Sequence, residues 1–191
     1  MKTIFAPVAS FRVLLLSSLV GLAACDSNAK EDPAPDPTAT NANVNEVHWK
    51  INGTEYVGRD IAQVQAHYRP TTADNLPATA KDMLILANDN KNCQVTVLIT
   101  NFTGVGTYNL TATNGMIGGF TQLTGSKDTY SSQWSAKAPA GQFIVTEFDA
   151  AKLTLKGTFS FNARVRISSG VYGAEQDVTN GSFDIKKVIK Y

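Results

Sequence analysis

A strict alternation of apolar and polar side chains over residues 152–167 constrains the fold of this chain more than any other feature. The odd positions from Leu153 to Ile167 are mostly apolar, and the even positions carry threonine, lysine, serine, asparagine or arginine. A period of two residues is that of a β-strand with one buried and one solvated face. Because a strand of this length is unusual at ~3.3 Å per residue, we expect a bulge or a sharp bend at Gly157.

Shorter runs of the same kind fill most of the chain after residue 46, and turn residues separate nearly all of them. They cover residues 47–57, 61–69, 83–87, 93–100, 106–110, 116–123, 129–134, 143–148 and 178–188. The sequence has no helical period of useful length. We therefore expect one all-β domain at residues 46–191, built as an antiparallel β-sandwich or a flattened β-barrel.

Asn52 and Gly53 predict a two-residue hairpin turn inside the first of these runs. Both central positions of such a turn need a positive φ, which asparagine and glycine tolerate best. The turn fixes the register of the flanking strands, so three cross-strand pairs are expected. They are Ile51 with Thr54, Lys50 with Glu55, and Trp49 with Tyr56.

The first 45 residues have the composition of an export signal followed by a tether. Lys2 and Arg12 form a basic leader, residues 13–24 are apolar but too short to span a bilayer, and the Leu-Ala-Ala-Cys ending at Cys25 resembles a bacterial lipobox. We predict a lipoprotein signal peptide at residues 1–24 and a lipid on Cys25. The Pro-, Asn- and Asp-rich residues 25–45 then form a flexible tether. The lipid places the protein in the cell envelope, at the outer membrane, on a side that the sequence does not specify.

The charge balance argues against a nucleic-acid partner. The chain has 17 lysine and arginine and 16 aspartate and glutamate side chains, for a formal net charge of +1. A nucleic-acid-binding protein concentrates basic side chains to neutralise phosphates. Only Lys186, Lys187 and Lys190 gather in this way, and we interpret them as a solvated strand end.

The sequence predicts neither a metal site nor a cofactor. His48 and His67 lack the spacing of a metal motif. Residues 88–92 resemble a calcium loop, but Lys91 stands among the would-be ligands, so a polar hairpin loop is the better interpretation. Cys93 is in phase with the apolar positions of its strand, which predicts a small buried hydrophobe and not a catalytic thiol.

Two carboxylates, Glu147 and Asp149, are candidates for glycan chemistry. Glycoside hydrolysis requires a pair of carboxyl groups that flank the scissile bond. Residues two apart on a strand are instead parallel neighbours on one face, and these two precede a turn. We favour a solvated strand end and keep Glu147 as a candidate binding residue.

Aromatic side chains provide the remaining candidate site. Tyr130, Ser132 and Trp134 alternate within the run 129–134. If Tyr130 and Trp134 lie exposed on a flat strand face, they would suit a sugar ring or a protein partner in the envelope. Core packing is the alternative, and we favour it because the domain has only two tryptophans.

Two segments resemble those of a known family. Residues 155–161 (LKGTFSF) and 178–184 (VTNGSFD) are similar to the paired G-T-F-S-F and T-N-G-x-F segments of a family of uncharacterised Bacteroidota outer-envelope lipoproteins. Residues 49–53 and 145–149 are similar too. The resemblance covers about residues 47–188 and implies an all-β fold and an envelope location. It implies no catalytic residues, because the family has no established activity.

Taken together, the residues indicate a lipid-anchored envelope protein that acts as a binding or structural accessory module. A glycan-acting hydrolase is the first alternative, and it requires a second carboxylate facing Glu147 across a cleft. A lipocalin-like carrier of small ligands is the second, and it requires an apolar interior too large for its own side chains.

Overall fold

The computed structural model describes residues 44–69 and 81–191, which belong to one unit of the chain. The predicted signal peptide, the predicted lipid site Cys25 and the predicted tether up to residue 43 lie outside the described residues. The described part is nearly all β-structure. None of its helices is long and apolar enough to cross a membrane.

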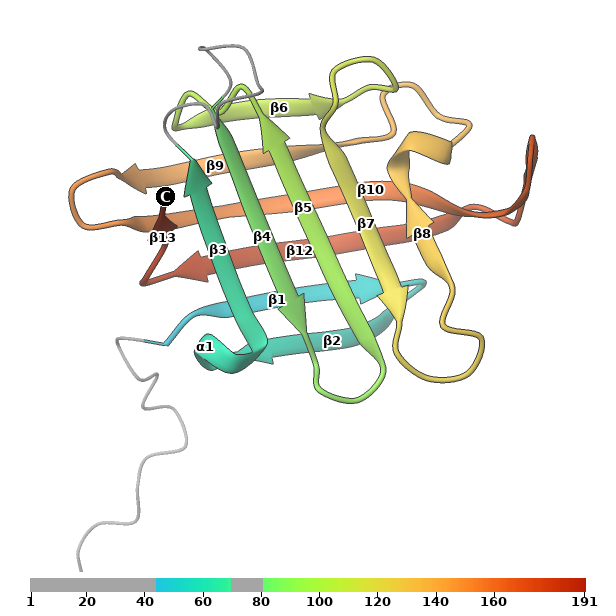
Figure 1. Ribbon diagram of the computed structural model, residues 1–191, viewed down its shortest axis with the longest axis horizontal. Coiled ribbons are helices and arrows are strands. Elements are labelled where there is room, and N and C mark those ends of the chain that lie inside the picture. The colour runs from blue at the N-terminus through green and yellow to red at the C-terminus, as the bar shows by residue number, and fades with distance from the viewer. Residues whose placement is uncertain (1–43, 70–80) are drawn as a thin grey trace, which may run out of the picture. The chain divides into compact units, whose positions relative to one another are not determined.

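Two layers of strands pack against each other, and their strands cross at a steep angle (Figure 1). In hydrogen-bonding order, the first layer contains β6 (Gly106–Leu110), β9 (Gly141–Asp149), β10 (Thr154–Ser168), β12 (Gln176–Ile185), β1 (Glu46–Ile51) and β2 (Thr54–Arg59). The second contains β13 (Ile189–Lys190), β3 (Val64–Arg69), β4 (Asp82–Asn88), β5 (Cys93–Thr100), β7 (Ile117–Gln122) and β8 (Thr129–Ser131). The short strand β11 (Val171–Tyr172) pairs only with the end of β10.

The long strand β10 belongs to both layers. Most of it pairs with β9 and β12, whereas Arg164 and Val165 pair with Ser131 and Tyr130 of β8. The strands therefore form one continuous sheet that curls over itself. This architecture confirms the predicted all-β domain. It corrects one detail, because β13 runs parallel to β3 and makes the sheet mixed instead of purely antiparallel.

Asn45 joins the two layers where the chain enters β1. Its amide nitrogen donates to the carbonyl of Val64 at 3.2 Å, and its amide oxygen accepts from the backbone N–H groups of Lys186 at 2.9 Å and Lys187 at 3.0 Å. The residue is 3% exposed. Buried amides are stable only when they are paired in this way, so Asn45 fastens the first strand to β3 and to the last turn of the chain.

The interior is filled by apolar side chains from both layers. The alternation along β10 directs Leu155, Phe159 and Phe161 inward, as the sequence predicts. Phe143, Val145, Phe183 and Ile185 meet them from β9 and β12, and Val95, Val97 and Ile99 meet them from the second layer. The described residues thus form a packed core between the two layers.

The predicted irregularity at Gly157 is present. The register between β9 and β10 shifts between Lys156 and Gly157, so Thr146 is an extra residue on β9. A Cβ atom on Gly157 would lie 2.1 Å from the carbonyl oxygen of Ile144 and 2.4 Å from the ring of Phe183. The bulge therefore needs glycine at this position, because β9 and the Phe183 ring come so close.

The β1–β2 hairpin has the predicted turn and register. Asn52 and Gly53 have φ values of 48° and 86°, and all three predicted pairs are formed. The rings of Trp49 and Tyr56 stack with their centroids 5.7 Å apart.

Two strands are shorter than predicted because local hydrogen bonds favour turns. The run 61–69 begins as the short helix α1 (Asp60–Gln63), where the Asp60 carboxylate accepts from the N–H of Ala62 at 2.7 Å. The run 129–134 ends its strand at Ser131 and continues as the 3₁₀-helix η1 (Ser132–Trp134). The Ser131 hydroxyl accepts from the N–H of Gln133 at 3.2 Å and caps that turn.

The loop between β4 and β5 is held by one carboxylate. Asp89 accepts hydrogen bonds from the N–H groups of Lys91 at 3.1 Å, Asn92 at 2.7 Å and Cys93 at 2.9 Å. Partial burial raises the pKa of Asp89, but these backbone donors outweigh it and bring the pKa below its ordinary value of 3.8. The loop is thus a polar hairpin connection, as predicted.

We expect Asp89→Ala to lower the free energy of unfolding by about 1–2 kcal/mol at about pH 7, because three N–H groups lose their acceptor. The folded pKa is the lower one, so this stabilisation is present above the unfolded pKa and is lost as the pH falls through the folded pKa. Urea unfolding at about pH 7 and about pH 2 measures the difference. Asp89→Asn, which keeps one acceptor oxygen, should lose less. An equal loss at both pH values would contradict the prediction.

Candidate functional site

The structure does not bring the predicted binding residues Tyr130, Trp134 and Glu147 together. Tyr130 faces the interior and stacks on Phe120 with ring centroids 4.4 Å apart. Trp134 lies in η1 and stacks on Tyr172 at 6.4 Å. The expectation that Tyr130 and Trp134 share one strand face is therefore wrong, because β8 ends at Ser131 and the chain turns.

Glu147 lies on the outer surface, near the far end of β9. Phe143 and Val145 point inward, and the extra residue Thr146 reverses the phase so that Glu147 points outward. Its carboxylate pairs with the ammonium of Lys156 at 3.2 Å. Asp149 instead accepts backbone hydrogen bonds in the following turn, so the two carboxylates do not flank a cleft.

The histidines and the thiol have ordinary structural contacts. His48 pairs with Glu46 at 2.9 Å, and His67 stacks on Tyr191 at 5.4 Å. Burial raises the pKa of the Cys93 thiol to about 11, which keeps it protonated. Within residues 44–69 and 81–191, no group of three or more metal-ligating side chains is found.

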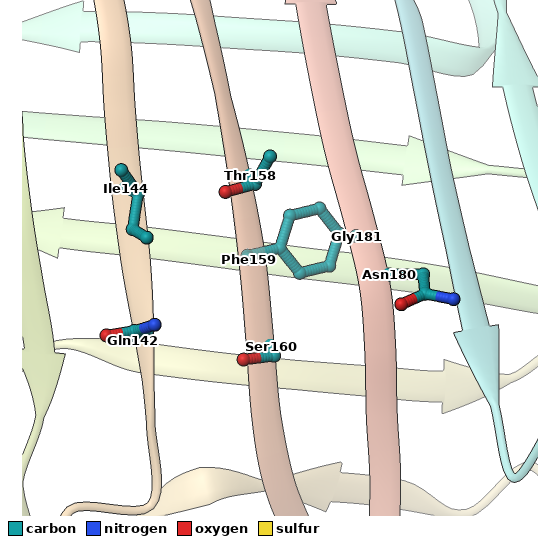
Figure 2. A pocket seen from close by; sticks show the side chains of 7 residues that line it. All are labelled: Gln142, Ile144, Thr158, Phe159, Ser160, Asn180 and Gly181. Atoms are coloured by element: carbon teal, nitrogen blue, oxygen red, sulfur yellow. The ribbon is translucent and has the colours of Figure 1, made fainter.

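A hollow on the outer face of the first layer is the best candidate site (Figure 2). It lies where residues 155–161 and 178–184 pair with each other, with Gly157 opposite Phe183 and Phe159 opposite Gly181. Their phenylalanines point into the core, and their small polar residues point outward. Seven residues of three strands line the hollow: Gln142 and Ile144 of β9, Thr158, Phe159 and Ser160 of β10, and Asn180 and Gly181 of β12.

A bulge in β12 gives the hollow its shape. Thr179 and Asn180 together oppose Ser160 alone, and Asn180 has the left-handed φ of 51°. A Cβ atom on Gly181 would lie 2.4 Å from the ring of Phe159, so only glycine fits beside that ring. Gly181 therefore lets the Phe159 ring pack directly beneath the floor of the hollow, and the exposed Asn180 lies at its edge.

The polar side chains of the hollow are neutral and unpaired. Gln142, Thr158, Ser160 and Asn180 line the hollow, and the side-chain hydrogen bonds of the described residues, such as Lys156 to Glu147 and Asn162 to Asp177, involve none of them. Several charged and polar side chains on the same face are paired: Glu147 with Lys156, Asp184 with Lys186, Glu46 with Arg59, and Asn162 with Asp177. The hollow thus offers donors and acceptors that no other described residue uses.

The side chains that line the hollow are uncharged. Its lining side chains include amides, hydroxyls and one isoleucine, but no carboxylate, histidine, lysine or cysteine. Amides and hydroxyls can donate and accept hydrogen bonds at once, whereas general acid–base catalysis needs a titratable group near the reacting atoms.

The sequence did not predict this hollow, because outward polar residues on a strand look like an ordinary solvated face. The one available signal was the Asn180-Gly181 pair inside a strand.

The fold and this hollow define an all-β protein with an open hollow on one outer face, lined by neutral polar side chains. The chain belongs to the family described as a domain of unknown function, DUF6252, whose model matches residues 62–185. The match includes every residue of the hollow but neither β1 nor β2. No curated protein and no solved structure matches the chain.

Proposed function

We propose that this protein is an envelope-held binding module that takes a neutral, hydroxyl-rich ligand, a glycan, on the outer face of β9, β10 and β12. The observation that carries the proposal is the set of four unpaired neutral side chains that converge on one hollow. Sugar hydroxyls both donate and accept, and amide and hydroxyl side chains match them in both roles. A neutral ligand also avoids the cost of burying an unpaired charge.

The face around the hollow suits an extended chain of sugars. Thr107 and Asn109 of β6 lie opposite Ile144 and Gln142, and they continue the polar rows across one more strand. Neighbouring strands are about 4.8 Å apart, so the rows from β6 to β12 span about 15 Å. A polysaccharide that crosses the strands would meet a polar side chain at each of them.

The envelope location is part of this proposal and rests on the sequence alone. The basic leader, the short apolar segment and the lipobox-like ending at Cys25 support a cleaved signal and a lipid anchor. Several acyl chains hold a protein on a membrane stably, whereas one chain binds only marginally. A module tethered in this way would hold a glycan, or a protein that carries one, at the cell surface or in the periplasm.

The hydrolase alternative has less support. It requires two carboxyl groups on opposite sides of a glycosidic bond. Glu147 is engaged by Lys156 outside the hollow, and the described lining residues provide no carboxylate to face it.

The proposal predicts that neutral oligosaccharides bind and that Gln142→Ala weakens their binding about twofold to tenfold, since one hydrogen bond contributes about 0.5–1.5 kcal/mol. Ser160→Ala should have a similar effect, and Thr158→Arg should block the hollow. Isothermal titration calorimetry of residues 25–191 carrying Cys25→Ser, with a panel of neutral and anionic oligosaccharides, measures the affinities.

Gln94→Ala is the matched control, because Gln94 is a half-buried glutamine on the outer face of the second layer. It should leave affinity unchanged. The proposal fails if no neutral oligosaccharide binds, or if the Gln94 and Gln142 variants lose affinity equally.

A further inference from the structure

The end of β10 and the strand β11 form a two-stranded ribbon that carries three exposed apolar side chains. Ile167 is 67% exposed, Val171 is 50% exposed and Tyr172 is 40% exposed. The three side chains lie within six residues of one another along the chain. The ribbon continues past β8, beyond the second layer (Figure 1). Large apolar side chains gathered at one exposed place commonly mark a surface that another partner covers.

The base of the ribbon is firmly held. Glu175 pairs with Arg164 at 2.8 Å and accepts hydrogen bonds from the hydroxyl of Ser135 and the N–H of Ala136. Partial burial raises the pKa of Glu175, but these contacts outweigh it and keep the pKa below its ordinary value. The ring of Trp134 stacks on Tyr172 from the same base. The apolar side chains are thus presented on a supported element.

All charged side chains of the ribbon are positive. Residues 163–174 contain Arg164 and Arg166 and no acidic residue. Arg164 is neutralised by Glu175, whereas Arg166 is exposed and forms no ion pair with a described residue. The turn at residues 168–170 is Ser-Ser-Gly, which carries no charge. The tip of the ribbon can therefore enter an apolar environment without burying a charged group. The guanidinium of Arg166 can stay in water beside it.

We propose that this ribbon docks onto a lipid surface with anionic headgroups. Aliphatic side chains at the tip, aromatic rings at the base and an unpaired arginine beside them match the layers of a membrane interface, where apolar groups reach the acyl boundary and tyrosine and tryptophan lie at headgroup depth. Anionic headgroups attract the exposed guanidinium. This inference does not depend on the glycan site, which lies on another part of the sheet.

Vesicle binding tests the inference. Residues 25–191 with Cys25→Ser, which carry neither the leader nor a lipid, are sedimented with phosphatidylcholine vesicles that contain or lack phosphatidylglycerol. We expect binding to the anionic vesicles, and a loss of more than about tenfold in partitioning for the double variant Ile167→Ser, Val171→Ser, since each side chain removes its apolar transfer free energy. Arg166→Gln should weaken binding to anionic vesicles about fivefold and leave neutral vesicles unaffected.

Val105→Ser is the matched control, because Val105 is 63% exposed but lies outside the ribbon. It should bind vesicles like the unsubstituted chain. All positions are exposed, so thermal unfolding should show every variant folded. The inference is overturned if neither kind of vesicle binds the chain, or if the Val105 and ribbon variants behave alike. A concentration-dependent dimer that the double variant abolishes, without vesicle binding, would assign the ribbon to a second copy instead.

Discussion

Replacing Trp49 with alanine is expected to lower the free energy of unfolding by about 3–5 kcal/mol, the usual cost of removing a large aromatic side chain from a core. Trp49 is fully buried on β1, where its ring stacks on Tyr56. The cavity would open in the core that β1 shares with the second layer. Guanidinium unfolding followed by circular dichroism measures the loss.

Two further variants keep this prediction testable if the alanine variant does not fold. Trp49→Phe should lose much less, because the ring keeps most of the buried apolar area and the indole Nε1 has no hydrogen-bond partner within residues 44–69 and 81–191. Trp134→Ala, at the half-buried tryptophan of η1, should also be milder. If the Trp134 variant proved the more destabilised of the two alanine variants, the assignment of Trp49 to the core would be wrong.

The second large effect is expected at Gly157. Alanine there would place its methyl group 2.1 Å from the carbonyl oxygen of Ile144 and 2.4 Å from the ring of Phe183. A backbone carbonyl in a sheet cannot move aside as a surface side chain can, so β9 or β10 would have to shift. We expect a loss of about 3 kcal/mol, at the upper end of the cost of overpacking.

The neighbouring variant Thr158→Ala serves as its control. Thr158 is exposed on the same strand and should change stability by less than about 0.5 kcal/mol. Chemical unfolding of both variants compares them directly. A Gly157 variant as stable as the Thr158 variant would show that the bulge tolerates a side chain and that the close approach of β9 is not needed.

The parts of the fold that the sequence predicted are those set by neighbouring residues. The alternation along β10 has a period that only a half-buried strand satisfies, and Asn52-Gly53 determines both the turn and the register of the β1–β2 hairpin. The bulge at Gly157 could also be anticipated, because a long strand with an interior glycine has to bend somewhere.

The direction of Glu147 could not be predicted from its own strand. The alternation of Phe143 and Val145 continues to Glu147 in the sequence, yet the residue points outward. The reversal comes from Thr146, which is an extra residue only because Lys156 and Gly157 of the neighbouring strand take a particular register. A bulge is a property of two strands, and one strand alone does not determine its position.

The hollow on the outer face of β9, β10 and β12 could not be predicted from the sequence for a related reason. Thr158 and Ser160 look like any outward residues of an amphipathic strand, and so does Gln142. What distinguishes them is the lack of a partner across three strands, whereas Lys156, on the same face, has Glu147 opposite. The aromatic residues Tyr130 and Trp134 attracted attention by residue type, but β8 is too short to present them together.

Because β10 belongs to both layers, it also determines how the chain can fold. Its hydrogen bonds reach β8, β9, β11 and β12, and Asn45 is bonded to residues more than a hundred positions away. Neither layer is complete before β10 and β12 have been made, so a nascent or truncated chain has no sheet that it can close. Sheets built from such distant partners fold slowly, in milliseconds to seconds, because loop closure precedes most of the favourable contacts. The same connectivity makes opening cooperative, so we expect the two layers to unfold together.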